Sequence, residues 1–386
     1  MHALAFLLAF CSAAAQEKES DPFRSRRAPV REGLLKRGGG EGTEEAVRGA
    51  LGWLARHQSA DGSWKVTGYI ERCPKDKPCK PNPGGEEGDG GVTALALVAF
   101  LGAGHSPLSK EFGEPVQKGI QWFLKRQDPE GCLESRDTMK YLYAHALATL
   151  ALAEAYGMSR AESLKAPAQK AVDFLVAAQN PGKGWRYSQK CGDNDTSVTG
   201  WVVMALRAAE MATLNFPRAA HDGARAWLDE VTDPETGRAG YTRRGFHHGI
   251  PLPNDQFDFH ETPTAMALHA RILIERKKSD PRLAKGRDLL LKDLPKWDGN
   301  AIDFYHWFQA SQALFQLAGP DETWKPWNDA VREALLKHQA AGDGCARGSW
   351  EPVDRWSYEG GRVYATAINA LTLETYYRNV QIFGDK

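Results

Sequence analysis

The sequence predicts an all-helical fold, an α/α toroid in which about six helical hairpins close into an inner and an outer ring. Pairs of helical segments recur at intervals of roughly 50 residues from Thr43 onward. In each pair an amphipathic segment precedes one that is apolar on nearly every face. A solenoid is the alternative, but an apolar helix in every unit favours a closed ring in which these helices bury one another.

The repeating unit is clearest between Lys170 and Met211. Its first segment, KAVDFLVAAQ, has apolar residues at helical spacing and ends at Gln179, before an Asn-Pro-Gly break. A polar loop with Trp185 follows. The second segment begins behind Asp195, a good N-cap, and is apolar on nearly every face. This stretch is therefore predicted to form an outer helix, a loop and an inner helix.

Five further hairpins follow the same order, each with an outer helix before an inner one. The predicted pairs are 43–58 with 90–105, 114–127 with 138–157, 221–231 with 262–276, 281–294 with 301–319, and 327–339 with 360–378. No segment alternates polar and apolar residues over a useful length. Strands are therefore expected to be few and short.

The N-terminal residues predict processing and export. An apolar run from Ala3 to Phe10 precedes three alanines at 13–15, so residues 1–15 are interpreted as a signal peptide. Residues 16–42 are polar and rich in Arg, Glu and Gly, which predicts a disordered linker before the toroid domain at 43–386. No later run of 18 apolar residues exists, so no transmembrane span is expected.

Charge and cysteine content narrow the function further. The chain has 49 Lys+Arg and 49 Asp+Glu residues, which argues against a nucleic-acid partner. Cys73 and Cys79 share one loop and are expected to form a local disulfide in an oxidising compartment, with zinc binding by the pair as the alternative. The remaining cysteines of the mature chain, each in a loop of a different repeat, are Cys132, Cys191 and Cys345.

Two segments carry a family resemblance. Residues 48–64 (RGALGWLARHQSADGSW) and 118–127 (KGIQWFLKRQ) resemble the Gln-Trp repeat of squalene–hopene cyclases, with weaker copies ending at Trp185 and Trp350. The resemblance spans residues 43–378 and implies the superfamily of terpenoid cyclases and protein prenyltransferase β-subunits. A glutamine at a helix end can bond free backbone groups there, so this motif indicates fold rather than reaction.

The stretch from Asp193 to Ser197, DNDTS, resembles the Asp-rich motif D-x-D-D-T-A of squalene–hopene cyclases. When Thr196 is aligned with the motif's threonine, Asn194 takes the place of the acid that protonates the alkene in that family. An amide cannot serve as that acid. The resemblance still makes Asp193 and Asp195 candidate catalytic residues, with helix capping by Asp195 as the alternative.

A second stretch resembles the zinc site of protein prenyltransferase β-subunits. Asp303, Tyr305 and His306 match the D-x-Y-H segment of that family, in which the His is a zinc ligand. Asp258 and His260 stand where the family has an upstream D-x-C. The resemblance implies a zinc site of Asp258, His260 and His306, with cavity-lining or capping roles as the alternatives. Asp303 and Tyr305 are also candidate catalytic residues.

The loops that enter the inner helices of a toroid surround one mouth of the barrel. Acids in these loops, Glu359 among them, are candidate catalytic residues, and helix capping is the alternative role. Aromatic rings around the cavity would stabilise a carbocation. The candidate rings are Trp201, Tyr305, Trp307 and Tyr364.

These observations leave three functions open. The first is a terpene cyclase or prenyltransferase-like protein that acts on or binds an isoprenoid. The second is a non-catalytic exported toroid that binds a ligand or a protein partner. The third is a carbohydrate-active enzyme, because such enzymes also use α/α barrels with paired acids. The expected small-molecule ligand is hydrophobic.

Overall fold

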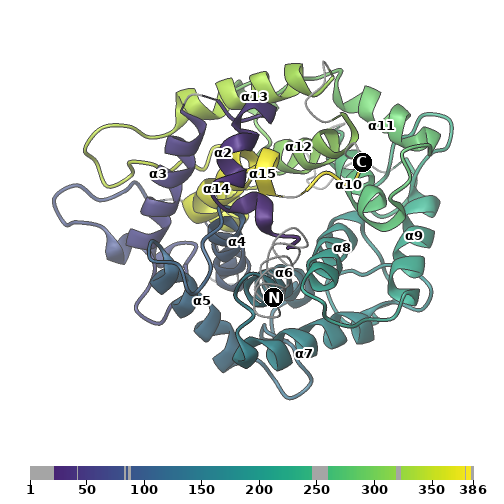
Figure 1. Ribbon diagram of the computed structural model, residues 1–386, viewed down its shortest axis with the longest axis horizontal. Helices are drawn as coiled ribbons and strands as arrows, with labels where there is room; N and C mark the ends of the chain where they lie inside the picture. Colours follow the sequence, from purple (N-terminus) through teal and green to yellow (C-terminus); the bar gives the residue numbers. More distant parts are fainter. Residues whose placement is uncertain are drawn as a thin grey trace, which may run out of the picture.

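The computed structural model describes residues 21–40, 42–81, 84–85, 88–245, 260–318, 323–378 and 380–383. In them the helices form two concentric rings (Figure 1). The inner ring consists of α4 (Asp89–Gly102), α6 (Tyr141–Ser159), α8 (Thr196–Met211), α10 (Thr262–Glu275), α12 (Phe304–Ala318) and α14 (Ser357–Leu373). Each inner helix packs on the next, and α14 packs on α4, so the ring is closed.

The outer ring alternates with the inner one along the chain. Its helices are α3 (Thr43–Arg56), α5 (Gly113–Arg126), α7 (Glu162–Ala178), α9 (Ala219–Val231), α11 (Pro281–Leu290) and α13 (Trp324–His338). The described residues form no strand, and one isolated bridge joins Thr232 and Ala239. The α/α toroid predicted from the sequence is thus confirmed. None of the described helices is long and apolar enough to cross a bilayer.

The apolar pattern explains which helix lies in which ring. In α6 every residue from 141 to 158 except Tyr143 is buried. By contrast, α5 buries one stripe that includes Val116, Ile120 and Phe123, at spacings of four and three residues. A helix that is apolar all round must be covered on every side, so it lies inside, and the striped helix covers it.

Glutamine side chains at the ends of four outer helices join their repeats to the next one. Nε2 of Gln58 donates to the carbonyl of Gly62 in its own loop (2.9 Å) and to that of Pro115 near the start of α5 (2.8 Å). The same pair of hydrogen bonds is made by Gln127 to Gly131 and Pro167, by Gln179 to Lys183 and Ala220, and by Gln339 to Gly348 and Ala46. Because Ala46 lies in α3, the bonds of Gln339 join the last repeat to the first.

The tryptophan of the repeat, in the loop that follows, bonds the C-terminal end of its own outer helix. The indole N–H of Trp64 donates to the carbonyl of Leu54 (2.7 Å), and Trp185 and Trp350 bond Leu175 and Leu335 in the same way. The glycine of the motif is required by its backbone. Gly62 has φ +98°, and a Cβ there would lie 2.4 Å from the carbonyl oxygen of Lys118. The Gln-Trp repeat is therefore a structural device, as the sequence predicts.

The N-terminal segment differs from the prediction of a disordered linker over 16–42. Residues 21–40 fold as η1 (Arg24–Arg26), α2 (Val30–Leu34) and η2 (Leu35–Arg37), which pack on one another and on α15 (Thr375–Arg378) (Figure 1). Phe23 is fully buried, and Arg26 is buried against Glu154 of α6 at 2.8 Å. The segment thus covers the end of the inner ring where Glu154 lies. The predicted signal peptide, 1–15, lies outside the described residues.

The Cys73–Cys79 disulfide expected from the sequence is not formed. Both residues are free cysteines. The physical reason is that both sulfur atoms turn toward the imidazole of His57, at 3.5 and 3.8 Å from Nε2.

Candidate functional site

A cavity of about 490 Å³ opens among the N-terminal ends of the inner helices. All six inner helices contribute to its wall, because their first turns surround a common axis. Small residues make the space. Gly91 of α4 has no atom within 4 Å of where a Cβ would lie. The volume falls within the range of about 300–1,000 Å³ that is typical of small-molecule sites.

Aromatic rings form much of the cavity wall. They are Tyr143, Tyr187, Trp201, Tyr241, Tyr305, Trp356, Tyr358 and Tyr364. Trp201 stacks on Tyr305, with ring centroids 6.0 Å apart and planes inclined by 12°, and on Phe308 at 5.6 Å. The wall therefore presents ring surfaces held in fixed orientations by their neighbours.

The polar atoms of these rings are paired within the wall. Four of the pairs join Trp201 Nε1 to Tyr143 OH (2.8 Å), Ser197 Oγ to Tyr305 OH (2.9 Å), Tyr187 OH to Tyr241 OH (2.8 Å) and Trp356 Nε1 to Asp303 Oδ1 (3.0 Å). A ligand in the cavity therefore does not have to satisfy these groups.

Aliphatic side chains complete the wall, and charge is confined to the mouth. Leu95, Leu147, Met266 and Ile368 line the cavity one or more turns along their inner helices. Among the described lining residues, the acidic and basic side chains other than His260 are Lys140 and Glu359. These two form an ion pair at 2.8 Å and are about half exposed. Burial opposes the charge of Lys140, but Glu359 raises the pKa of Lys140 above its usual value.

Asp193 and Asp195, the candidates from the Asp-rich motif, have different roles in the structure. Asp193 is exposed and lies 3.5 Å from Arg186. Asp195 is fully buried and caps α8 by accepting from the backbone N–H of Val198 at 2.7 Å. Burial raises the pKa of Asp195 to about 7, although the Val198 N–H and the Arg186 guanidinium act in the opposite direction. Neither carboxylate lines the cavity.

Asp303 lies behind the wall and holds it in place. Its carboxylate accepts from Thr262 Oγ1 (3.1 Å), Trp356 Nε1 (3.0 Å) and the backbone N–H of His306 (2.8 Å). Asp303 therefore positions one ring of the wall and the first turn of α12. Tyr305 and Glu359, the other two candidates, both line the cavity.

Asp354 is a buried carboxyl that the sequence analysis did not identify. It accepts from the backbone N–H of Phe304 (3.1 Å) and from Tyr364 OH (3.2 Å), and it also bonds Ser357. Burial and the nearby charge of Asp303 raise the pKa of Asp354 to about 7. The sequence signal that could have identified Asp354 is its place three residues before Ser357, the first residue of α14, because an acid just before a helix often bonds the first turn.

The zinc ligands expected from the prenyltransferase resemblance are only partly placed. His260 lines the cavity, whereas the ring of His306 packs edge-on against Trp327 of the outer helix α13, with centroids 5.7 Å apart. Burial lowers the pKa of His306. Asp258 lies outside the described residues. The described structure thus places His260 at the cavity and His306 against an outer helix, and it brings no ligand set together at the cavity.

Three of the four aromatic candidates line the cavity: Trp201, Tyr305 and Tyr364. Trp307 instead packs against Trp297 and Phe304, at ring-centroid distances of 6.3 and 5.6 Å. The rings that the sequence analysis missed are Tyr143, Tyr187, Tyr241, Trp356 and Tyr358. A usable signal exists for some of them, because Tyr143, Tyr305 and Tyr358 occupy the second or third position of an inner helix.

Comparisons with known proteins agree with this architecture. A family model described as the squalene-hopene cyclase C-terminal domain matches residues 91–248. A squalene–hopene cyclase of Bradyrhizobium diazoefficiens is 26% identical over 187 residues, which cover 44% of this chain and 26% of that protein. The match thus spans about a quarter of the length of this relative.

Solved structures share the fold over nearly the whole chain. A type II terpene cyclase from Scytonema superposes with a TM-score of 0.55 and 17% identity, over 86% of this chain and 97% of that one. An α-1,6-mannanase from a Salegentibacter species has a TM-score of 0.57 and 12% identity, over 86% and 98%. Together with the family model, these likenesses support the terpenoid cyclase-like α/α toroid superfamily that the Gln-Trp repeats indicate. The fold is also that of a carbohydrate-active enzyme, so it does not settle the activity.

Proposed function

We propose that this terpenoid cyclase-like α/α toroid binds an apolar, isoprenoid-type molecule in its central cavity. The observation that carries the proposal is the wall of aromatic and aliphatic side chains, with charge confined to one ion pair at the mouth. Such a wall gains free energy by burying hydrocarbon, at about 25 cal/mol per Å² of apolar surface. A similar toroid, the Scytonema type II terpene cyclase, has been solved in complex with geranylgeranyl dihydroxybenzoate.

The rim of the cavity supports entry of an apolar molecule. Met139 is 80% exposed and Tyr358 is 50% exposed, and both line the cavity. Large apolar side chains that stand in solvent beside a cavity are typical of binding sites for apolar ligands. The ion pair of Lys140 and Glu359 lies beside them and is suited to a polar end group of the ligand.

The positions of the acids favour binding over proton-initiated cyclisation. Among the described lining residues, the one carboxylate is Glu359, which is about half exposed at the mouth and already paired with Lys140 at 2.8 Å. A carboxyl group at an exposed mouth, bonded to another side chain, is poorly placed to deliver a proton to an alkene inside the cavity. Asp195 and Asp354 have pKa values near 7 and hold protons more readily, but both lie behind the wall.

The same observation counts against a glycosidase. Glycoside hydrolysis requires two carboxyl groups about 5–10 Å apart that face the substrate. Within the described lining only Glu359 faces the cavity, and it is already paired. The hydroxyl groups of the wall bond one another, so few remain for the many hydroxyls of a sugar.

Titration of the purified chain with farnesol and geranylgeraniol tests the proposal, with α-1,6-mannotriose as the carbohydrate comparator. Trp201 and Trp356 stand in the wall, so binding should change the intrinsic tryptophan fluorescence. The informative variant is Gly91→Phe, because Gly91 lines the cavity and no atom lies within 4 Å of where its Cβ would be, so a side chain there takes up cavity space. Phenylalanine is also a better helix former than glycine, so the variant should fold.

We expect Gly91→Phe to weaken prenol binding at least about tenfold, which corresponds to about 1.4 kcal/mol. Gly33→Phe is the matched control, because Gly33 also has no atom within 4 Å of where a Cβ would lie, but it lies in α2, away from the cavity. Wild-type affinity in Gly91→Phe, or a response to mannotriose with none to the prenols, would reject the proposal.

The proposal includes export of the chain. The apolar run and three alanines within residues 1–15 support a cleaved signal peptide. N-terminal sequencing of protein recovered outside the cytoplasm should then begin at Gln16. Recovery of the uncut chain in the cytoplasmic fraction would refute this part.

A further inference from the structure

Four potential metal ligands converge where the last repeat meets the first. Nε2 of His57 and the sulfur atoms of Cys73, Cys79 and Cys345 all lie within 4.8 Å of one another. We propose that this seam cluster (His57, Cys73, Cys79 and Cys345) binds one Zn²⁺ in a tetrahedral Cys₃His site. The site is separate from the cavity and does not depend on what the cavity binds.

The distances fit a single tetrahedral ion. Nε2 of His57 lies 3.1 Å from the sulfur of Cys345, 3.5 Å from that of Cys73 and 3.8 Å from that of Cys79. Zinc bonds of about 2.3 Å to sulfur and about 2.0–2.1 Å to nitrogen, at tetrahedral angles, require a nitrogen–sulfur separation of about 3.6 Å. The three observed separations scatter around that value.

The imidazole is oriented as a zinc ligand. Nδ1 of His57 donates to the carbonyl oxygen of Trp53, one turn earlier in α3, at 2.8 Å. This bond assigns the proton to Nδ1 and leaves the lone pair of Nε2 directed at the three sulfur atoms. Zinc-bound histidines usually donate their second ring nitrogen to a carbonyl or a carboxylate in this manner. The Trp53 ring also stacks on the imidazole at 4.2 Å and fixes its plane.

The surroundings suit three thiolates around a divalent ion. Such a centre carries one net negative charge. The guanidinium groups of Arg56, Arg72 and Arg362 all act electrostatically on His57. The indole N–H of Trp53 has no oxygen acceptor in the described structure and interacts with the sulfur of Cys79. Positive charge and an N–H donor beside a thiolate both stabilise its charged form.

A disulfide explains the cluster less well than a metal ion. A bond between any two of the three cysteines would leave the third thiol and the directed imidazole without a role. The zinc site uses all four groups. Since the protein supplies all four ligands, the site has no open position for a substrate, which is typical of a structural rather than a catalytic zinc.

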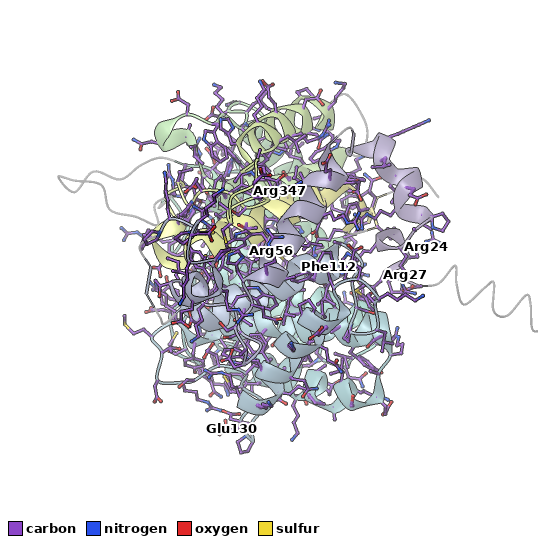
Figure 2. The ribbon with its side chains drawn as sticks, turned by 90° about the vertical axis from the view of Figure 1, so that its left-hand side faces the viewer. Arg24, Arg27, Arg56, Phe112, Glu130 and Arg347 are labelled. Carbon is purple, nitrogen blue, oxygen red and sulfur yellow. The ribbon has the colours of Figure 1, made fainter. Side chains whose placement is uncertain are left out.

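The position in the fold indicates what the ion does. His57 follows α3, Cys73 and Cys79 lie in the long loop before α4, and Cys345 lies in the loop after α13, 288 residues from His57. At the same face, Arg56 donates to the carbonyl of Arg347 at 3.0 Å, and Figure 2 shows the two residues close together. The ion would therefore fasten the closure of the ring.

Metal analysis of the purified full-length chain tests the proposal. Plasma mass spectrometry should find close to one zinc per chain. Replacing the zinc by Co²⁺ should give intense near-ultraviolet charge-transfer bands from thiolate ligands, together with the visible bands of a tetrahedral ion. This measurement needs no variant. Removal of the metal by a chelator should lower Tm, because an ion that binds only the folded chain stabilises it.

The variant Cys345→Ser should bind zinc at least about tenfold more weakly. Cys191→Ser is the matched control, because Cys191 is exposed and lies outside the cluster. Wild-type protein without zinc, with an intact mass that shows a disulfide among Cys73, Cys79 and Cys345, would overturn the proposal. Unchanged zinc affinity in Cys345→Ser would overturn it as well.

Discussion

Replacing Glu154 by Gln tests whether the N-terminal segment closes the barrel end opposite the cavity mouth. Oε1 of Glu154, near the C-terminal end of α6, accepts from Arg26 of η1 and from Arg378 of α15, both at 2.8 Å. All three side chains are at most 3% exposed. The carboxylate is therefore the point at which the two chain ends and the inner ring meet. The substitution keeps the size of the side chain and removes its charge.

The expected cost follows from this burial. Removing one partner of a buried ion pair costs about 3–5 kcal/mol. Glu374 lies 3.7 Å from Arg378, and burial raises the pKa of Glu374 well above its usual value, with the charge of Glu154 acting in the same direction. Removing the charge of Glu154 therefore lowers the pKa of Glu374, and this change offsets part of the loss. We therefore expect a cost of about 3 kcal/mol. With an unfolding entropy of about 2.1 cal/mol/K per residue, this lowers Tm by about 4 °C.

The pH dependence sharpens this test. Burial would raise the pKa of Glu154, but Arg26 and Arg378 outweigh it and lower the pKa below its usual value. A lowered carboxyl pKa stabilises the fold above the unfolded-state pKa, and this stabilisation is lost as pH falls through the folded-state pKa. The difference in unfolding free energy between wild type and Glu154→Gln should thus be largest near pH 7 and shrink below about pH 4.

Urea unfolding followed by far-UV circular dichroism measures the difference. Glu114→Gln is the control, because its pair with Lys118 at 2.7 Å is exposed to solvent, and its urea midpoint should not move. Trypsin should also cleave Glu154→Gln faster than wild type after Arg27, which lies in the loosened segment. A cost below about 1 kcal/mol at pH 7, or one that does not shrink between pH 7 and about pH 3, would refute the ion-pair argument.

Three further predictions concern the ring and the cavity entrance. Gln127→Ala removes the bonds to Gly131 and Pro167 and should lower the unfolding free energy by about 1–3 kcal/mol in urea titrations; no change would show that the glutamine bonds are dispensable. Asp354→Asn should flatten the pH dependence of stability. Because the folded-state pKa is raised to about 7, the wild type loses up to about 1.4 kcal/mol per pH unit between pH 4 and pH 7, and an equally steep variant would contradict the assignment. Gly361→Ala should cost about 1–3 kcal/mol in thermal unfolding, because φ +59° and ψ −153° suit only glycine; a neutral result would mean that the kink in α14 relaxes.

The inner helices could be predicted from the sequence because their signal is local. Predicted inner segments such as 196–211 coincide with the helix observed, since an uninterrupted apolar stretch needs no knowledge of its neighbours. The start of α7 could not be predicted as well. It begins at Glu162 rather than at the expected Lys170, because its first two turns mix polar residues with a few apolar ones and contain Pro167. Contacts with the neighbouring repeat, including the bond from Gln127 to Pro167, hold these turns.

The N-terminal segment shows why composition misleads. Arginine-rich, glycine-rich sequence is typical of disorder when its charges stay in water. Here Arg26 is buried and paired with Glu154, which lies 128 residues further along the chain. Nothing within residues 16–42 indicates that partner. Only the folded ring brings a buried carboxylate to the place where the arginine can neutralise it.

The candidate site was predictable in kind but not in detail. The aromatic character of the cavity follows from tyrosine and tryptophan in inner segments, and three of the four expected rings are there. The acids were harder to place, because an acid before a helix looks the same whether it caps the helix or faces a cavity. The structure shows Asp195 as a cap. Asp354 was missed because its partners, Phe304 and Tyr364, belong to two different inner helices.

Closing the ring is harder than extending it, which explains why the seam between the last and first repeats has additional contacts. Gln58 reaches Pro115 across 57 residues, whereas Gln339 reaches Ala46 across 293. The entropic cost of closing a loop of n residues grows as (3/2)RT ln n. Closing the seam through the bonds of Gln339 therefore costs about 1.4 kcal/mol more than joining two neighbouring repeats through the bonds of Gln58. One or two further bonds offset such a cost. The bond from Arg56 supplies one of them, and the proposed zinc would supply much more, at the one junction where no loop connects neighbouring repeats.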